Sequence, residues 1–436
     1  MATKDIIKRL DKAVYQGQIR IDIDAAQNPD LRKAIGIVEE FLKKTGRVCY
    51  GGQAINAQLP KKDQFYNLET SLPDYDFFSP DDKTDIKELV YALKAAGFTE
   101  ISERIGIHEG TTKLFVNYTA IADITQMDPG FYERIHSKSV SVDGIRYADP
   151  VFLRMLMFLE LSRPRGMLSR WKKVYERLSL LDSAHPLKKC LMSEAPVLES
   201  RAAHNSRPAI FRFILKNRRV FIGADIHALY KTNGQGRTAK TRTQYLLSGK
   251  APVVFLSPDA DIDASYLAEE VRARKEQILG FQGTLPAMVA LYHNDDLVCL
   301  IVQEESCHAT ISVPLTKGRN LRMASLDTLL TFLIGLYYRD DPILMSTDSL
   351  MCCLRNYMDL LQRFRARPTK TVPSFPLDCS GYQTTFASLL RAKGARIEAA
   401  RQRIGSGARI HKSGTIKRRA TLERYTRRRP KHPKLY

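Results

Sequence analysis

Three aspartates have the residue type and spacing of a metal-binding catalytic site. Asp74 and Asp76 lie two residues apart in the segment SLPDYDFFSP, and Asp123 follows in the segment TAIADIT. Side chains at positions i and i+2 of a β-strand point to the same face, so Asp74 and Asp76 can share one ion. Adjacent carboxylates repel each other unless a cation lies between them, and Mg²⁺ prefers hard oxygen ligands. The pair therefore predicts a bound Mg²⁺ or Mn²⁺.

Asp123 is the best candidate for a third ligand. It lies at the end of KLFVNYTAIADIT, a run of apolar and β-branched residues that is typical of a strand. On a strand beside the first pair, it would allow a second ion to bind about 3.5–4 Å from the first, as in-line displacement at phosphorus requires. We therefore expect a nucleotidyl transfer site in which all three aspartates bind metal and act in catalysis.

The Gly51-Gly52 pair is a candidate phosphate-binding turn. It follows the short apolar run 47–50 and precedes 53–56, where the pattern predicts the start of a helix. Glycine allows backbone N–H groups to approach a phosphate closely, and the N-terminus of a helix adds partial positive charge. The alternative is that the glycines simply end a strand.

Some nearby acidic residues have a structural explanation instead. The sequence Ser79-Pro80-Asp81-Asp82 matches a helix start, with Ser79 as the cap, so Asp81 and Asp82 are expected to cap a helix. Asp74 and Asp76 precede this start and alternate with aromatic residues. A costly polar pair among apolar neighbours favours a function there.

These motifs resemble a known superfamily. Gly-Gly, then D-x-D, then a single later Asp is the pattern of polymerase-β-like nucleotidyltransferases, which include poly(A) polymerases. The segment 148–181, ADPVFLRMLMFLELSRPRGMLSRWKKVYERLSLL, is similar to the one that follows the catalytic domain in poly(A) polymerase catalytic subunits of giant and other large cytoplasmic DNA viruses. The resemblance implies that Asp74, Asp76 and Asp123 are the catalytic triad. It also implies that Gly51 and Gly52 face the triphosphate, followed by Gln53 where many relatives have serine.

A basic segment follows the predicted catalytic region. SRPRGMLSRWKKV (162–174) gathers five arginines and lysines beside the only tryptophan. Departing pyrophosphate needs such cations, and Arg170 and Lys173 share a helix face at spacing i, i+3. By resemblance, Ser169, Arg170 and Lys173 are expected to bind the nucleotide. A plain basic helix surface is the alternative.

The positive charge is concentrated at the end of the chain. The 436 residues carry a net charge of +21, and the last 46 hold sixteen Lys and Arg against two Glu. Such an excess predicts a polyanionic partner held by salt-sensitive phosphate contacts. We expect a basic helix over 380–404, followed by a tail that is disordered until RNA orders it. A nuclear import signal at 427–431 is the alternative. The residues expected to bind RNA include Arg418, Arg419, Arg427, Arg428 and Arg429.

The second half of the sequence echoes the first. RVFIGADIHALY, from Arg219, parallels RVCYGGQAINAQ, from Arg47, so that Ala224 replaces Gly52. PVVFLSPDADIDASYLAEEV then parallels DYDFFSPDDKTDIKELVYAL after a six-residue insertion, which puts Pro252 at Asp74 and Val254 at Asp76. The sequence thus predicts a second copy without the D-x-D ligands. Chance similarity of two strand-cap-helix units is the alternative, since S-P-D is a common helix start.

The expected fold is α+β. A polymerase-β-like nucleotidyltransferase domain occupies 1–185, with a helical addition at 148–185, and a degenerate nucleotidyltransferase-like domain occupies 190–375. Residues 376–436 form the basic helix and tail. Helical periodicity predicts helices at 31–44, 85–96, 153–161, 168–181, 325–338 and 347–364, and alternation predicts strands at 297–303 and 309–314 and a hairpin at 139–148.

The cysteines and the apolar runs predict a soluble protein of a reducing compartment. Seven cysteines show no C-x-x-C or Cys/His metal spacing, so reduced thiols are expected. No apolar run approaches the roughly 20 residues of a membrane span, and no signal-peptide core is present. The resemblance places the protein in the host-cell cytoplasm or the viral factory, with packaging in the virion as a further option.

The predicted activity is template-independent addition of AMP from ATP to the RNA 3′ end by two-metal transfer. The partners are then RNA and ATP, with a homodimer implied by the resemblance and no membrane. One alternative is another RNA 3′-nucleotidyltransferase, CCA-adding or uridylating, because carboxylates do not select a base. The other is a non-catalytic RNA-binding or processivity subunit, which would need no carboxylates.

Overall fold

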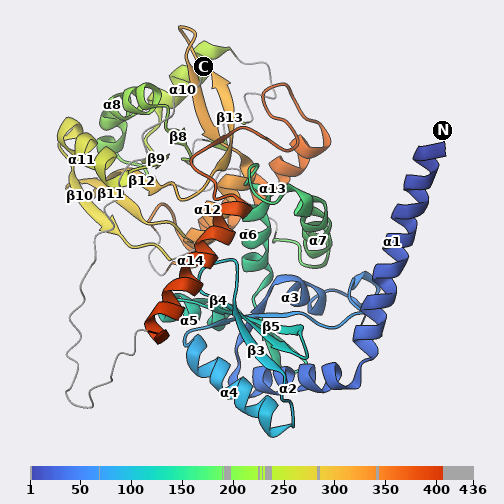
Figure 1. Ribbon diagram of the computed structural model, residues 1–436. Helices are drawn as coiled ribbons and strands as arrows, with labels where there is room; N and C mark the ends of the chain where they lie inside the picture. The colour runs from blue at the N-terminus through green and yellow to red at the C-terminus, as the bar shows by residue number, and fades with distance from the viewer. Residues whose placement is uncertain are drawn as a thin grey trace, which may run out of the picture. The chain divides into compact units, whose positions relative to one another are not determined.

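Two β-sheets, one in each half of the chain, organise the structure (Figure 1). This computed structural model describes residues 2–67, 69–188, 190, 198–223, 226–227, 229–230, 238–281, 285–339 and 343–405. The α+β fold class is confirmed. Ala224 and the five tail arginines, 418, 419, 427, 428 and 429, lie outside the described residues. Within the described part of the chain, no helix has the length and apolar character to cross a membrane.

The first sheet has seven strands in the order β3-β4-β5-β2-β1-β7-β6. Strand β2 runs antiparallel to β1 and parallel to β5, and β7 runs parallel to β1. The strands are β1 (Val48–Tyr50), β2 (Tyr75–Ser79), β3 (Ile101–Ile105), β4 (Thr111–Val116), β5 (Thr119–Gln126), β6 (Val140–Val142) and β7 (Ile145–Tyr147). The predicted hairpin is the β6–β7 pair, and Asp143 and Gly144 both have positive φ in its turn.

The helices around this sheet begin and end at recognisable caps. Asn28 caps α2 by accepting from Asp30 and Leu31 N–H, and Gly46 ends it in the left-handed conformation. Asp81 caps α4, two residues after the predicted Ser79, because Ser79 still belongs to β2. The helices are α1 (Ala2–Gln27), α2 (Pro29–Thr45), α3 (Gly51–Ala57), the 3₁₀ turn η1 (Lys61–Asp63), α4 (Asp82–Ala95), α5 (Pro129–Lys138), α6 (Pro150–Leu161), the 3₁₀ turn η2 (Leu168–Arg170) and α7 (Trp171–Ala184).

The second sheet has eight strands in the order β10-β11-β12-β9-β8-β14-β13-β15. The strands are β8 (Val220–Phe221), β9 (Val253–Ser257), β10 (Arg274–Ile278), β11 (Met288–His293), β12 (Asp296–Gln303), β13 (His308–Pro314), β14 (Asn320–Ala324) and β15 (Cys379–Ser380). The helices are α8 (Arg201–Asn217), α10 (Ala239–Ser248), α11 (Ala260–Val271), α12 (Leu326–Tyr337), α13 (Thr347–Ala366) and α14 (Phe386–Gly405).

The two sheets have equivalent strand orders, which confirms the predicted internal repeat. Each strand of the first sheet has a counterpart at the same place in the second sheet, numbered seven higher, so that β1 corresponds to β8 and β7 to β14. Strand β15 is an addition at one edge. In β1, Val48 pairs with Phe78 and Cys49 with Phe77, while in β8 Val220 pairs with Leu256 and Phe221 with Phe255. The numbering offset is thus 172 at the first strand and 178 at the second, as the six-residue insertion predicts.

A buried ion pair recurs at the same place in both copies. Arg47 makes two hydrogen bonds to Asp85, of 2.7 and 2.8 Å, and Arg219 makes two to Asp263, of 2.6 and 2.9 Å. Both carboxylates are almost fully buried. Such bidentate pairs depend on geometry, so their recurrence at the predicted offsets is strong evidence against chance similarity.

Equivalent helices of the two copies pack against each other. Helix α6 follows β7 and α12 follows β14, and the two helices are in contact. The Tyr338 hydroxyl, just after α12, donates to the Asp149 carboxylate that caps α6, at 2.5 Å. Phe131 stacks on Phe281 with 4.5 Å between ring centroids. The apolar residues of both copies therefore share one core.

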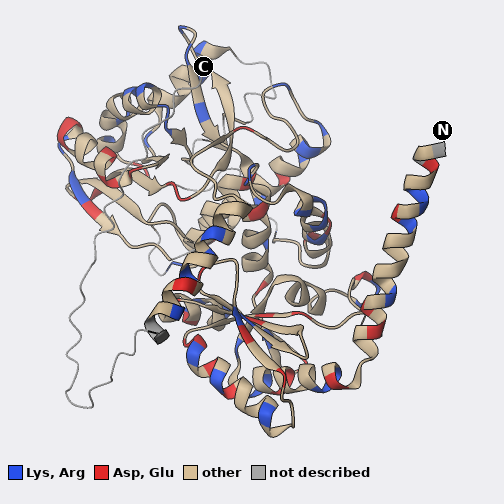
Figure 2. Cartoon of the chain, in the orientation of Figure 1, with Lys and Arg blue, Asp and Glu red and all other residues tan. Residues whose placement is uncertain are grey.

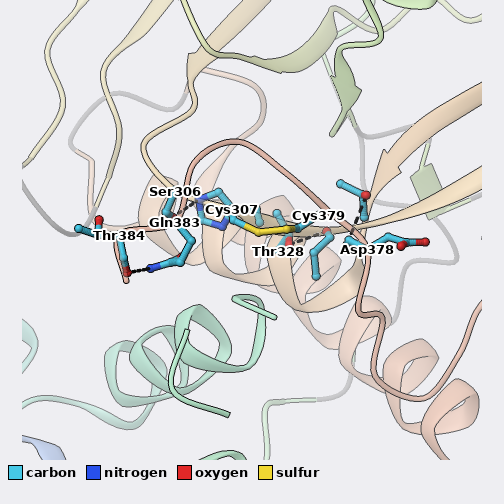
Figure 3. Close-up of a disulfide and its surroundings, with 10 residues drawn as sticks. Ser306, Cys307, Thr328, Asp378, Cys379, Gln383 and Thr384 are labelled. Carbon is cyan, nitrogen blue, oxygen red and sulfur yellow. Dashed lines mark hydrogen bonds between the residues drawn. A yellow bond between two sulfur atoms is a disulfide. The ribbon is translucent and has the colours of Figure 1, made fainter. Parts of the chain in front are cut away.

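The expectation of reduced thiols is wrong for four cysteines. Cys190 is bonded to Cys352, with a Cα–Cα distance of 5.1 Å. Cys307 is bonded to Cys379, with a Cα–Cα distance of 5.4 Å (Figure 3). The partners are 162 and 72 residues apart in sequence, so the fold, and no local motif, brings them together. Cys49, Cys299 and Cys353 are free and buried.

The end of the second sheet extends past the boundary expected at residue 375. Strand β15 pairs with β13, where His308 faces Ser380 and Ala309 faces Cys379. The predicted basic helix is present as α14. Residues Met1–Lys393 form one compact unit, apart from Gly394–Tyr436, so the division into 1–185, 190–375 and 376–436 stays a prediction.

Candidate active site

The three aspartates come together at one end of two parallel strands. Asp76 in β2 lies directly opposite Asp123 in β5. Asp74 lies one residue before β2 begins, just outside the strand in which the sequence pattern placed it. The parallel pairing follows from the topology, because the helix α4 and the β3–β4 hairpin cross over between the two strands.

The Gly51-Gly52 turn lies against the second aspartate. Gly51 has φ of 74°, a conformation that glycine adopts easily, and it begins α3 directly after β1. A β-carbon added to Gly51 would overlap the Asp76 carboxylate at Oδ2. The turn and the D-x-D motif therefore touch, and a side chain at position 51 would displace one of the carboxylates.

The electrostatics of the cluster call for a cation. Burial, followed by repulsion from the charges of Asp74 and Asp123, raises the pKa of Asp76 to about 8. Burial also raises the pKa of Asp74, followed by repulsion from Asp123. Lys113 opposes both shifts. Holding three carboxylates ionised together thus needs positive charge.

Lys113 supplies part of that charge. It lies on β4 opposite Asp123, and its ammonium forms an ion pair with Asp123 Oδ2. Acidic and basic positions meet where β4 and β5 run side by side (Figure 2). The other Asp123 oxygen, Oδ1, is buried and has no hydrogen-bond partner among the described residues.

The residues present fit a divalent ion by chemistry. Carboxylate oxygens are the ligands that Mg²⁺ and Mn²⁺ prefer, and the orphaned Asp123 Oδ1 and the raised pKa of Asp76 would both be relieved by an ion. Within the described ranges, no three His, Cys, Asp or Glu side chains already converge as a finished metal centre. Lys113, paired with Asp123 Oδ2, would compete with such an ion for that carboxylate.

An arginine lies over the second glycine. A β-carbon on Gly52 would come within 2.8 Å of Arg177 Nη1 and 2.7 Å of the Tyr66 hydroxyl. Arg177 Nη2 donates to that hydroxyl at 2.8 Å, and the guanidinium stacks on Phe65, 4.5 Å from the ring centre. Arg177 is thus fixed beside the first turn of α3, whose N–H groups have no partners within the helix.

The loop that carries these aromatic residues is itself anchored. Asn56, buried in α3, accepts hydrogen bonds from the backbone N–H groups of Phe65 and Tyr66 at 2.8 and 2.9 Å. The chain from Asn56 to Tyr66 to Arg177 therefore links the glycine turn to α7. This linkage orients a cation toward the place where a triphosphate is expected.

The other predicted nucleotide-binding residues are placed as follows. Arg170 forms an ion pair with Glu160 at 2.9 Å, and Ser169 is exposed in η2. Lys173 is near the aspartates, since it lowers the pKa of Asp74. Its own pKa is lowered by burial and by Arg177 and Arg170. Gln53 is buried in α3, which leaves its backbone N–H as the group available to a phosphate.

Comparison with known proteins agrees with this geometry. Residues 36–167, which include the triad and the glycine turn, match the sequence model of a family described as poly(A) polymerase catalytic subunit. The resemblance predicted from the sequence is thereby confirmed. A candidate poly(A) polymerase catalytic subunit of Acanthamoeba polyphaga mimivirus is 29% identical over 160 residues, which cover 36% of this chain and 27% of the relative.

Further relatives come from other large DNA viruses. A candidate poly(A) polymerase catalytic subunit of African swine fever virus (isolate Tick/Malawi/Lil 20-1/1983) is 27% identical over 187 residues, which cover 42% of this chain and 39% of the relative. The similarity thus spans well under half the length of these viral subunits. The crystal structure of the Megavirus polyadenylate synthase superposes with a TM-score of 0.74 at 18% identity, covering 92% of this chain and 84% of that chain. This match shows a shared fold across both copies.

The second copy has apolar residues where the first has Asp76, Asp123 and Lys113. Strand register places Val254 at the position of Asp76 and Leu300 at that of Asp123, because Val254 pairs with Leu300 as Asp76 pairs with Asp123. Ala290 pairs with Leu300 and so stands at the position of Lys113. The predicted loss of two ligands therefore extends to the third ligand and to the lysine.

Sequence reasoning missed Lys113 and Arg177. Lys113 looks like an ordinary strand residue, and only the pairing of β4 with β5 reveals it. Arg177 could have been found, because it follows Lys173 by four residues and so shares its helix face. Tyr66 had no signal, since the loop that carries it has no regular pattern.

Proposed function

We propose that this protein is a template-independent poly(A) polymerase that adds AMP from ATP to the 3′ end of RNA. The single observation that supports this most is the contrast between the copies. The first keeps Asp74, Asp76, Asp123 and Lys113 around a glycine turn, while the second has apolar residues at the equivalent strand positions. The family match over residues 36–167 covers the charged copy alone.

The three aspartates would bind the metal ions and take part in the chemical step. Two divalent ions held by Asp74, Asp76 and Asp123 would polarise the RNA 3′-hydroxyl and neutralise charge on the leaving pyrophosphate. Asp123, which pairs with Asp76 across the strands, would help remove the proton of that hydroxyl, whose oxygen would then attack the α-phosphorus in line. Positioning and charge neutralisation supply most of the rate in such transfers.

The nucleotide-binding groups lie on the other side of the aspartates. The N–H groups at Gly51, Gly52 and Gln53 would receive the triphosphate, with Arg177 fixed beside them by Tyr66. Lys173 adds a second cation. Arg170 would also bind phosphate after leaving its ion pair with Glu160. Ser169, in η2, would donate a hydrogen bond to the triphosphate. These contacts would bind a triphosphate and do not read the base, so the selection of ATP is proposed from the family match.

The remaining partners are proposed on sequence grounds. The tail arginines would hold RNA upstream of its 3′ end, because sixteen cations in 46 residues favour phosphate contacts. Location in the cytoplasm or viral factory, and packaging in the virion, stay predictions.

The homodimer implied by the resemblance also stays a prediction. Helix α1 carries exposed Ile7, Leu10, Val14 and Ile21, a stripe that a second copy would cover. Its basic first half, 4–12, and its acidic end at Asp22 and Asp24 favour antiparallel pairing. Light scattering of the wild-type protein and of Leu10→Lys would show a dimer that the variant loses, and a monomeric wild type would contradict the prediction.

Primer extension with single nucleotides tests the proposed activity. The purified chain is incubated with labelled oligo(A), Mg²⁺ or Mn²⁺, and ATP, UTP, CTP or GTP in separate reactions. We expect long products with ATP alone. Preferred use of UTP or CTP would instead identify a uridylating or CCA-adding enzyme. RNA binding without extension in any reaction would identify a non-catalytic subunit.

A further inference from the structure

The second copy has a polar pocket that the catalytic proposal does not use. It has a volume of about 320 Å³ and lies where the end of α8 meets β13 and β14. The side chains that matter here are Arg218, Arg322, Ser312, Asn320 and Asp378, all of which line it. Figure 2 shows basic positions on the β13 side of the second sheet, which Figure 1 labels.

The two arginines stand out when the copies are compared. In the first copy, Tyr147 pairs with Cys49, and Arg146 pairs with Val48. In the second copy, Met323 pairs with Phe221, the equivalent of Cys49. Arg322, one residue before Met323, is therefore the equivalent of Arg146. Arg146 lies beside Gly46, the left-handed cap of α2, at 3.7 Å from a β-carbon built there. In the second copy, the equivalent of Gly46 is Arg218.

Arg218 occupies a conformation that suits glycine. It ends α8 with φ of 53°, in the left-handed region, and its N–H caps the carbonyl of Ile214. A side chain with a β-carbon is strained there, so glycine at this position would relieve strain. The guanidinium of Arg218 is exposed at the pocket.

Both arginines are available to a ligand. Among the described residues, neither Arg218 nor Arg322 forms a side-chain hydrogen bond or ion pair. Arg219, also in the pocket wall, is different because Asp263 neutralises it. Asp378 is the acidic residue of the pocket, and Arg322 also opposes the rise that burial causes in the pKa of Glu304. The pocket therefore keeps an excess of positive charge.

The surroundings of the pocket extend this charge. Lys216 precedes Arg218, and Lys317 and Arg319 lie in the β13–β14 turn that leads into the pocket; all three are exposed. Ser312 and Asn320 add neutral hydrogen-bond donors. Two guanidiniums with flanking donors suit phosphodiester groups spaced along a single strand.

We propose that the Arg218–Arg322 pocket binds the phosphate backbone of single-stranded RNA at a site separate from the reaction centre. This inference rests on the proposed function for the identity of the RNA. Its role is to hold the growing strand while the 3′ end is extended at Asp74, Asp76 and Asp123. The second copy, having lost its catalytic charges, would thereby have gained a binding function.

Arg218→Gly is the decisive variant, because it removes the guanidinium and also relieves backbone strain. We expect its melting temperature to equal or exceed that of the wild type, which excludes misfolding as the cause of a defect. Arg272→Gly is the matched control, since Arg272 is an equally left-handed cap, with φ of 54° on α11, and does not line the pocket. Arg218→Gly combined with Arg322→Ala removes both guanidiniums.

Binding of labelled oligo(A) is measured by fluorescence anisotropy over a range of salt, without nucleotide or metal. The double variant should bind roughly tenfold more weakly. A plot of the logarithm of the binding constant against the logarithm of salt concentration should become less steep by about 1.4. This is about 0.7 for each phosphate of a single strand that an arginine no longer neutralises. Arg272→Gly should match the wild type in both. Unchanged affinity and slope in a folded double variant would overturn the proposal.

Activity separates this inference from the proposed function. With a short saturating primer, the double variant should add the first nucleotide at the wild-type rate, because its substitutions lie outside the catalytic residues. With a long primer at limiting concentration, it should dissociate sooner and make shorter tails. A wild-type chain that binds oligo(A) through this pocket yet extends nothing would refute the polymerase and support the RNA site. Equal tail lengths in wild type and variant would refute the site alone.

Discussion

Lys113 on β4 forms an ion pair with Asp123 on the neighbouring strand β5, directly across the register of the sheet. In this way an ammonium group lies beside carboxylates whose burial and mutual repulsion raise the pKa of Asp76 and Asp74, and it opposes both shifts. Lys113 thus neutralises part of the negative charge of the three aspartates before a metal ion binds. In the second copy the carboxylates and the lysine are both absent from the equivalent strand positions.

Replacing Lys113 should reveal this balance directly. Lys113→Met removes the cation, so we expect Mn²⁺ to bind more tightly by about 1 kcal/mol, or roughly fivefold, at this partly exposed pair. In EDTA the variant should melt at a lower temperature than the wild type, and Mn²⁺ should restore it. Mn²⁺ titration by electron paramagnetic resonance and thermal melting check both effects. Weaker Mn²⁺ binding by the variant would contradict the account.

Gly51 should tolerate no side chain. Gly51→Ala adds a β-carbon that overlaps Asp76 Oδ2 and also strains a residue with φ of 74°. We expect extension activity to collapse, measured as kcat on a fixed primer. Gly97→Ala is the control, because Gly97 has φ of 96° with nothing within 4 Å of its β-carbon position. It should cost about 1 kcal/mol of stability and leave kcat unchanged. Equal kcat losses in the two variants would show that strain alone matters.

Tyr66 should act on the nucleotide through Arg177. Tyr66→Phe removes the hydroxyl that accepts from Arg177 while keeping the ring, so we expect a several-fold higher KM for ATP with a smaller change in kcat. Arg177→Ala should raise KM further. Lys172→Ala serves as the comparison, because Lys172 is exposed on α7 and pairs with Glu176. A normal KM in both Tyr66→Phe and Arg177→Ala would remove Arg177 from the nucleotide site.

Acid should destabilise the second copy through His308. Burial lowers the pKa of His308 to about 3, whereas a histidine in the unfolded chain titrates near 6.5. The unfolded state therefore binds the proton first, and stability falls as the pH drops from about 6.5 toward 3. Between pH 7.5 and pH 5 the loss should be about 2 kcal/mol in urea unfolding.

The histidine can be separated from other acid effects by substitution. His308→Gln should remove that part of the acid dependence even if it lowers stability overall. His293→Gln, at the exposed end of β11, should keep the wild-type pH profile. Identical profiles for all three proteins would show that His308 contributes nothing.

The features that could be predicted from the sequence are those marked by a local residue pattern. The aspartates at Asp74 and Asp76 were visible because two charges in an apolar run have few structural explanations. The repeat was visible because its offset is nearly constant, and the position of Val254 follows directly from it. Short-range patterns of this kind can be recognised without knowledge of the fold.

Contacts between distant segments could not be predicted in the same way. Arg177 meets Tyr66 across 111 residues, and Cys190 meets Cys352 across 162. No periodicity marks such pairs, because they depend on how the two copies and their loops pack. The register that makes Lys113 face Asp123 likewise exists only once β4 and β5 have paired.

The central claim is that all catalysis takes place at the charged copy. The most direct measurement is primer extension with ATP by the double variant Asp74→Asn and Asp76→Asn, beside Asp81→Asn. Asparagine is also a good cap for α4, so Asp81→Asn should behave as the wild type. The double variant should fold and bind oligo(A) normally and lose activity by about three orders of magnitude or more. Near-normal extension by the folded double variant would contradict the account.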